Sequence, residues 1–93
     1  MRLVWTAEAL DDRRAIYDFI EFDNPIAALE LDESISQCAC RLPDFPELGR
    51  PGRIPGTREL VAHQNYILIY DVAGDLIRVI RVLHAARQWP QMC

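Results

Sequence analysis

The segment RVIRVLHAARQWP, residues 78–90, places one histidine and three arginines within a largely aliphatic run. A histidine such as His84 titrates near neutral pH, so it is suited to passing a proton to or from a reacting group. Arginines such as Arg81 and Arg87 present a planar fork of donors that binds phosphate or carboxylate groups. The segment therefore has the residue types of a site that acts on a phosphate ester.

A structural role for the same residues is the alternative interpretation. A charge buried without a partner is costly, and opposite charges on neighbouring strands stabilise a sheet. In this interpretation Arg78 and Arg81 pair with Glu59 or Asp71 across the sheet, and the histidine bonds backbone carbonyls at the end of its strand. The residues alone leave both interpretations open.

The ten basic residues of the chain are all arginines, so lysine amine chemistry is excluded. Residues 1–40 hold three arginines and nine acidic residues, a net charge of −6, whereas residues 41–93 hold seven and five, a net charge of +2. The total charge of −4 argues against a general affinity for nucleic acid, although the arginines gather in the second half.

Length and composition predict one soluble domain, residues 1–93, with 51% hydrophobic and 26% charged residues. No apolar run approaches the length of a membrane span, and no signal-peptide core follows Met1, so we expect a cytoplasmic protein. No glycine-rich phosphate loop and no metal-ligand spacing occur, so no cofactor or metal is expected.

The first half of the chain predicts a short strand over residues 2–5 and two helices. Thr6 is a good N-cap for a helix that runs to about residue 22, with Leu10, Ile16, Tyr17 and Ile20 as its apolar stripe. Asn24 and Pro25 start a second helix that ends before Pro43. Its apolar seam consists of Ala28, Leu31, Ile35, Cys38 and Leu42. The short connection predicts an antiparallel hairpin.

The second half predicts a loop and three strands. Residues 43–57 contain four prolines and three glycines, too many for a helix or a central strand. The runs RELVA, NYILIYDV and LIRVIRVL follow, and their short connections predict an antiparallel meander. Strict alternation in the last strand places Arg78, Ile80, Val82 and His84 on one face, and Ile77, Val79, Arg81 and Leu83 on the other. A helical hairpin covers one face only, so we expect a bare apolar face that a partner segment covers.

Four segments resemble the RelE/ParE superfamily of toxins from bacterial type II toxin-antitoxin modules, in order along nearly the whole chain. They are WTAEAL, NPIAA, PELGRPGRIPGTREL and IRVLHAARQWP. The resemblance implies an α+β fold, a two-helix hairpin packed on a small antiparallel sheet. It also implies a growth-inhibiting toxin that a cognate antitoxin neutralises in a hetero-oligomer.

The superfamily contains two activities. One branch, which is RelE-like, cleaves messenger RNA on the ribosome by attack of a 2′-hydroxyl on the adjacent phosphate, which requires a base, an acid and cations for the developing charge. For that activity the chain offers His84 as the acid or base. The candidate phosphate clamps are Arg58, Arg81 and Arg87, and the candidate bases are Glu47 and Glu59. The other branch, which is ParE-like, is not enzymatic and traps DNA gyrase on broken DNA.

A departure from the nuclease pattern favours the gyrase-directed branch narrowly. Nuclease members carry an arginine in the middle strand, whereas the corresponding stretch here is YILIY, residues 66–70. In the gyrase-directed branch the residues expected to contact the target are Arg50, Arg53, Arg78, Arg87 and Trp89. A ribosome-dependent nuclease stays the alternative, and a relative that has lost activity and only binds a partner is a third possibility.

Overall fold

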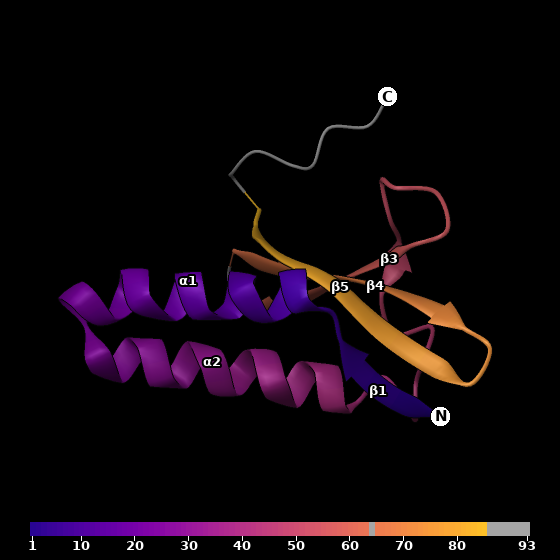
Figure 1. The fold of residues 1–93 in the computed structure, drawn as a ribbon, viewed down its shortest axis with the longest axis horizontal. Coiled ribbons are helices and arrows are strands. Elements are labelled where there is room, and N and C mark those ends of the chain that lie inside the picture. The colour runs from indigo at the N-terminus through magenta and orange to yellow at the C-terminus, as the bar shows by residue number, and fades with distance from the viewer. Residues whose placement is uncertain (64, 86–93) are drawn as a thin grey trace.

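A computed structural model describes residues 1–63 and 65–85. The elements in chain order are β1 (Arg2–Trp5), α1 (Ala7–Asp23), α2 (Pro25–Cys40), β2 (Arg50–Pro51), β3 (Arg58–His63), β4 (Tyr66–Ala73) and β5 (Leu76–His84). The two helices form a hairpin that packs on the sheet and projects beyond its end (Figure 1). The predicted α+β architecture is therefore confirmed. Among the described residues, no helix is long and apolar enough to cross a membrane.

The strands form one sheet in the order β1-β5-β4-β3-β2. The pairs β5-β4, β4-β3 and β3-β2 are antiparallel, as the meander predicts. β1 pairs with β5 in parallel, so the sheet as a whole is mixed, with one parallel pair added to the predicted antiparallel strands. The physical reason is the connection: parallel neighbours require a long crossover, which the helices and the other strands supply here.

Both helix starts follow the predicted capping chemistry. The Thr6 hydroxyl oxygen accepts a hydrogen bond from the Ala9 N–H at 3.1 Å. The Asn24 side-chain oxygen accepts one from the Ala27 N–H at 3.1 Å, and Pro25 is the first residue of α2. These caps satisfy N–H groups that have no partner within the helix.

The core lies between the helices and the sheet, and most of the predicted seam of α2 contributes to it. Ala28, Leu31, Ile35 and Leu42 are buried. On α1 the prediction of Leu10 as a core residue is wrong, since Leu10 is 50% exposed and its neighbour Ala9 is fully buried. Successive helical residues point about 100° apart, so only one of these two neighbours can face the sheet.

A bulge in β5 changes which side chains share a face. Tyr70 pairs with Val79 and Ile69 pairs with Arg81, so Ile80 is an extra residue without a partner on β4. Val79 faces the helix-side core, whereas Arg81 lies on the same face as Ile69, away from that core. The predicted strict alternation, with Val79 and Arg81 on one face, is therefore wrong.

The sheet face away from the helices is not bare at its centre. Ile67 and Ile69 belong to this face and are 4% and 1% exposed. Glu59 pairs with Ile69 from β3 and is itself only 4% exposed. The expectation of an uncovered apolar face is wrong at these positions.

Candidate functional site

The arginine-rich loop before β3 is fixed to the sheet by Tyr70. The fully buried Tyr70 hydroxyl accepts a hydrogen bond from the Gly49 N–H at 2.9 Å and donates one to the Pro46 carbonyl at 2.8 Å. Burial raises the pKa of Tyr70 above its ordinary value of 10.0. A Cβ at Gly49 would lie 2.8 Å from the Glu59 carbonyl oxygen and from the Tyr70 ring, so the close approach requires glycine.

Glu59 holds the next part of this loop, residues 50–53. One oxygen of its buried carboxylate accepts a hydrogen bond from the Arg53 N–H at 2.8 Å. The other lies 3.4 Å from a guanidinium nitrogen of Arg50, whose side chain is 64% exposed. A charge-assisted bond to a backbone N–H orders a turn, so Arg50 and Arg53 are presented to solvent from a fixed backbone. β2, which the sequence did not predict, forms here by pairing with β3.

Arg58, a predicted phosphate clamp, is used within the same loop. One guanidinium nitrogen donates to the Gly49 carbonyl at 2.7 Å. The other lies 3.9 Å from a carboxylate oxygen of Glu47, whose side chain is 87% exposed. Arg58 pairs with Tyr70 across the strands, which places it on the helix side of the sheet. The proposed base Glu47 is therefore a partner of Arg58 rather than a buried, activated carboxylate.

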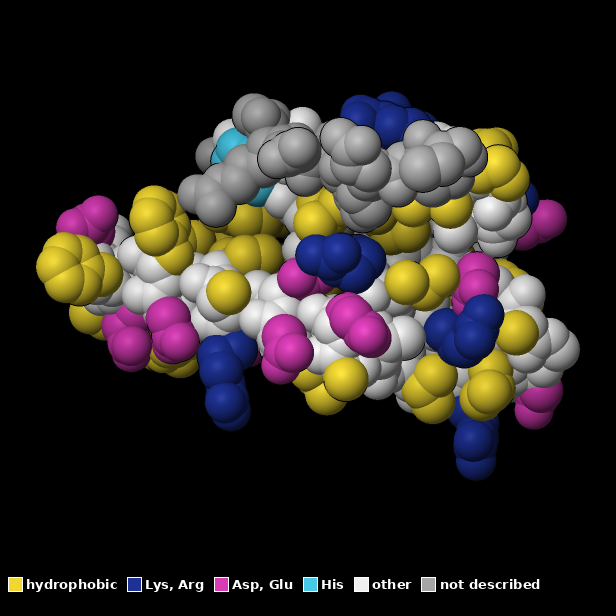
Figure 2. All heavy atoms as spheres, turned by 45° about the horizontal axis from the view of Figure 1, so that its top comes forward, with side chains coloured by type: hydrophobic (Ala, Val, Ile, Leu, Met, Phe, Trp, Pro, Cys, Tyr) yellow, Lys and Arg dark blue, Asp and Glu magenta, His cyan; other side chains and the backbone are white. Residues whose placement is uncertain are grey.

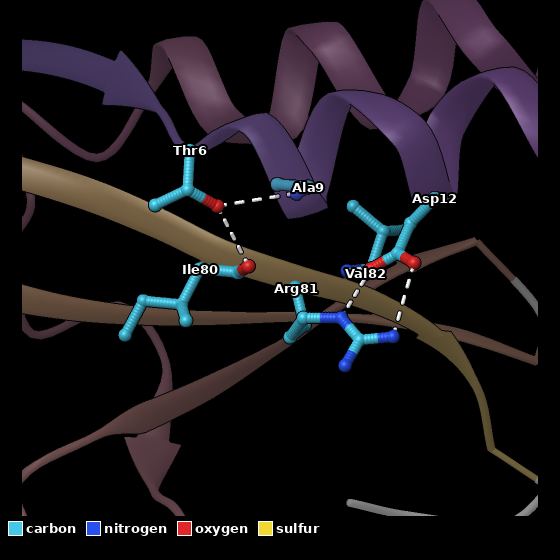
Figure 3. Close-up of polar contacts among 6 residues, drawn as sticks. All are labelled: Thr6, Ala9, Asp12, Ile80, Arg81 and Val82. Atoms are coloured by element: carbon cyan, nitrogen blue, oxygen red, sulfur yellow. Dashed lines mark hydrogen bonds and ion pairs between the residues drawn. The ribbon is translucent and has the colours of Figure 1, made fainter.

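Arg81 is bonded to α1, and this contact was not predicted. Asp12 accepts hydrogen bonds from Arg81 through both carboxylate oxygens, at 2.7 and 3.1 Å (Figure 3). The oxygen at 2.7 Å also accepts the Val82 N–H at 2.9 Å. The hydrogen bond to Asp12 raises the pKa of Arg81. The Asp12 carboxylate thus neutralises the Arg81 guanidinium. It also satisfies a backbone N–H of β5 beyond the point where β1 ends.

Thr6, the N-cap of α1, completes this closure of the β5 edge. β1 ends at Trp5, and the next backbone N–H, from Thr6, donates to the Val79 carbonyl at 3.0 Å. The Thr6 hydroxyl donates to the carbonyl of the bulged Ile80 at 2.8 Å (Figure 3). The start of α1 therefore takes over the pairing of β5 where β1 stops.

Arg78 forms the pair that the structural interpretation allows. Its guanidinium donates to both oxygens of Asp71, at 2.8 and 2.5 Å, and this hydrogen bonding raises the pKa of Arg78. The prediction is confirmed for Arg78 and wrong for Arg81, whose partner is Asp12 on a helix rather than Glu59 or Asp71 on a strand. Asp12 and Arg81 are 69 positions apart, and no local pattern joins them.

His84 stands at the end of β5 with its ring perpendicular to that of Tyr66, at 5.0 Å between ring centres. His84 pairs with Tyr66, and Arg58 pairs with Tyr70, four residues further along β4. At 3.3 Å per residue this separates the two backbones by about 13 Å. Arg81 lies on the opposite face from Arg58. The three predicted nuclease residues therefore do not converge on one point.

Two predicted contact residues, Arg87 and Trp89, lie outside the described residues. Across residues 1–63 and 65–85, no group of three or more histidine, cysteine or acidic side chains is placed to hold a metal ion.

Comparison with known proteins shows the family. The chain matches the model of the ParE toxin of the type II toxin-antitoxin system, parDE, over residues 3–89. It is 41% identical to Y4kP of Sinorhizobium fredii over 92 residues, covering 98% of this chain and 95% of that protein. It is 38% identical to toxin RelE2 of Caulobacter vibrioides over 86 residues, covering 92% and 97%.

The fold agrees with the sequence match. A structure of the chromosomal ParDE toxin-antitoxin system from P. aeruginosa superposes with a TM-score of 0.83 at 30% identity, covering 90% of this chain and 95% of that one. The fold and the arginine-bearing sheet define a toxin of the RelE/ParE superfamily. Within that superfamily, the chain belongs to the ParE toxin family of type II toxin-antitoxin modules.

Proposed function

We propose that this protein inhibits bacterial growth by binding DNA gyrase in the cytoplasm, and that it does not cleave messenger RNA. The observation that carries the proposal is the contact between Arg81 and Asp12. A phosphate clamp needs a guanidinium with donors directed at the substrate. In Arg81 two of the three nitrogens already donate to a carboxylate whose side chain is 16% exposed.

The other cations of a nuclease site are also engaged. Arg78 is paired with Asp71, and Arg58 is bonded to the Gly49 carbonyl. The middle of β4 carries Ile67 and Ile69, both buried, where nuclease relatives place an arginine. His84, Arg58 and Arg81 do not face one space, which favours action by contact.

The loop that carries Arg50 and Arg53 is the proposed contact surface for gyrase. Glu59 and Tyr70 hold its backbone, so little conformational entropy is lost when a target binds. Arg78, which keeps 46% of its side chain exposed, would extend the contact, and we assign the same role to Arg87 and Trp89.

A cognate antitoxin is the second proposed partner, in a hetero-oligomer that silences the toxin. Support comes from the family match and from the structural relative, which belongs to a toxin-antitoxin system. We expect co-expression of the neighbouring antitoxin gene to restore the growth of cells that produce the toxin.

The test is to induce the protein and to follow amino-acid incorporation and plasmid supercoiling over the first minutes. We expect supercoiling to fall while translation continues. The double variant Arg50→Ala/Arg53→Ala should lose this effect while remaining folded, because both side chains are exposed and the Arg53 N–H that bonds Glu59 is kept. Arg2→Ala, which removes an exposed arginine far from the loop in sequence, is the matched control.

The opposite result would establish the nuclease alternative. Immediate arrest of translation with normal supercoiling, and its loss in His84→Ala, would overturn the gyrase proposal. Removal of a proton-transfer group costs roughly a hundredfold or more in rate, so that loss would be unmistakable.

A further inference from the structure

A pocket lies where three parts of the chain meet: the loop after α2, the residue before β1 and the end of β4. Its volume is about 750 Å³, and its apolar walls are Met1, Phe45, Pro46, Leu48 and Val72. Small-molecule sites in proteins are clefts of about 300–1,000 Å³ with mostly apolar walls and a few polar groups. The size and the lining of this pocket fit that class of site.

The walls of the pocket are side chains that the core does not use. Among the described residues, ten large hydrophobic side chains are exposed, and four of them line this pocket: Met1, Phe45, Leu48 and Val72. Single exposed apolar residues are common on protein surfaces, whereas a cluster of them around one hollow is typical of a binding site.

The loop that carries Phe45 and Leu48 is fixed before anything binds. The Phe45 N–H donates a hydrogen bond to the carbonyl of buried Leu42 at 3.1 Å, and the Leu48 N–H donates one to the Phe45 carbonyl at 3.0 Å. Between them, the Pro46 carbonyl accepts the hydrogen bond from the Tyr70 hydroxyl. A preformed pocket loses little conformational entropy when a ligand enters.

Arg58 supplies a positive charge to this pocket. One terminal guanidinium nitrogen donates to the Gly49 carbonyl at 2.7 Å. The other lies 3.9 Å from a carboxylate oxygen of Glu47, which is longer than a hydrogen bond. The Glu47 side chain is 87% exposed, so it can turn into the water and leave this nitrogen to a ligand. One charge-assisted hydrogen bond from a single nitrogen demands less of Arg58 than a two-point phosphate clamp.

The other charges of the pocket restrict the ligand further. Asp44 and Glu47 also line it, and both are exposed, whereas the Arg58 side chain is only 31% exposed. The two carboxylates repel a ligand with several negative charges, such as a nucleotide. A cationic ligand would face the guanidinium, which is the charge that lies furthest from water. A single negative charge on an apolar body is therefore the best match.

We propose that this pocket binds a small amphipathic monocarboxylate. Its carboxylate would replace Glu47 at the Arg58 guanidinium, and its hydrocarbon chain would lie against Phe45, Leu48 and Val72.

The pocket is separate from the proposed gyrase contact. Arg50 pairs with Glu59, which lies on the sheet face away from the helices. Arg58 and Val72 pair with Tyr70 and Ile77, which belong to the core on the helix side. Ligand binding is measured on the purified protein without gyrase, so failure of either proposal leaves the other standing.

The probe is decanoate, and its two controls are acetate, which lacks the chain, and decyltrimethylammonium, which carries the opposite charge. Calorimetry measures the affinity, and amide NMR spectra locate the site. We expect decanoate to bind with a dissociation constant on the order of 1 mM or tighter, as a ligand of this size allows. It should shift the amide signals of Phe45, Leu48 and Val72. Neither control should bind at the same concentration.

Two phenylalanine variants test the apolar wall. Phe45→Ser should weaken decanoate binding about tenfold, as loss of an aromatic anchor does. Phe22→Ser is the matched control, because Phe22 is 91% exposed near the end of α1. Figure 2 shows hydrophobic side chains at this projecting end of the hairpin, at the left, with acidic side chains beside them. A chain that adsorbs without specificity would meet this end too, so Phe22→Ser should bind decanoate like the unchanged protein.

Two glutamate variants test the charge. Glu47→Gln removes the carboxylate that competes for Arg58, so it should tighten decanoate binding several-fold. Glu33→Gln, an exposed change of the same charge on α2, should leave the affinity unchanged. Arg58→Gln should abolish binding, but it also weakens the bond to Gly49, so its unfolding temperature is measured alongside. Glu47→Gln keeps the test decisive if Arg58→Gln does not fold.

Three results would overturn the proposal. The first is equal binding of decanoate by Phe45→Ser and Phe22→Ser, which would show adsorption elsewhere. The second is tighter binding of decyltrimethylammonium than of decanoate, since Asp44 and Glu47 would then select the ligand. The third is binding of a short peptide that ends in leucine and phenylalanine with a free carboxylate, while decanoate does not bind. The occupant would then be the end of a protein chain.

Discussion

Individual carboxylates determine which arginines of this protein can contact a target. Asp12 binds Arg81 and the Val82 N–H, and Asp71 binds Arg78. Glu59 binds the backbone N–H of Arg53 as well as the guanidinium of Arg50. An arginine whose donors are used inside the fold contributes to stability, and only one that reaches solvent can act on a target.

We expect removal of the Asp12 side chain to destabilise the protein. Asp12→Ala leaves the Val82 N–H and the Arg81 guanidinium without their acceptor, which costs about 1–3 kcal/mol. Asp12→Asn keeps an acceptor oxygen and should lose less. The exposed neighbour Asp11, changed to alanine, is the control and should stay within about 0.5 kcal/mol. Urea unfolding measures all three, and equal effects of Asp11→Ala and Asp12→Ala would contradict the assignment.

Tyr70 predicts a loss of stability in alkali. Its pKa is raised in the folded protein, so above pH 10 the unfolded chain loses the phenolic proton first, and the free energy of unfolding falls as pH rises. Tyr70→Phe removes this group and should flatten that part of the profile, although it also loses two hydrogen bonds. Tyr17→Phe is the comparison, because Tyr17 also has a raised pKa and lies on α1. An unchanged profile in Tyr70→Phe would contradict the contribution of Tyr70.

Among the elements, the loop over residues 43–57 is held in place by the sheet, although most of it has no regular secondary structure. Tyr70, Arg58 and Glu59 come from two adjacent strands and bond the loop at three points. Its backbone is thereby fixed by side chains of the sheet in addition to the short pairing of β2 with β3. This arrangement makes the loop a rigid support for Arg50 and Arg53.

Trypsin cleavage after Arg53 reports on this rigidity, whereas the bond after Arg50 precedes Pro51 and is not a trypsin site. Glu59→Leu removes the acceptor of the Arg53 N–H, so the loop should open and be cut several times faster. Glu59→Gln keeps an acceptor oxygen and should be cut at an intermediate rate. Val61→Ala, an exposed change on the same strand, should leave the rate unchanged. Fast cleavage of the unchanged protein after Arg53 would show that the loop is not held.

Much of the element pattern could be predicted from local chemistry, and the contacts between distant elements could not. Thr6 and Asn24 could be identified as helix starts from the sequence, because a cap bonds an N–H only three residues away. The parallel pairing of β1 with β5 and the bulge at Ile80 have no local signal. The same limit explains the site: Arg78 and Asp71 flank one turn and could be paired, whereas Asp12 reaches Arg81 only after the whole fold forms.

For the whole molecule, the separation of charge sets the range of partners. The net charge is −4, with −6 in residues 1–40 and +2 in residues 41–93. An arginine surface on such a molecule attracts a target over short distances, while the acidic hairpin repels polyanions.

We therefore expect weak binding to DNA of mixed sequence. Non-specific DNA binding depends on neutralised phosphates, and the dissociation constants of dedicated DNA-binding proteins are about 10⁻⁴ to 10⁻⁶ M at physiological salt. This protein should bind more weakly than that range in a gel-shift assay at 0.15 M salt. Tight binding with a steep dependence on salt would indicate that nucleic acid itself, rather than a protein surface, is the target.

The parallel contact between β1 and β5 has a consequence for synthesis of the chain. The first strand to be made lies against the last one, and Thr6 bonds a carbonyl 74 positions later. Contacts between distant parts of a sequence form slowly, because the intervening chain must first be brought together. β1 therefore has no strand to pair with until residues 76–79 have left the ribosome (Figure 1). A nascent toxin therefore lacks its finished sheet, and with it the folded surface, until β5 has been made and can pair with β1.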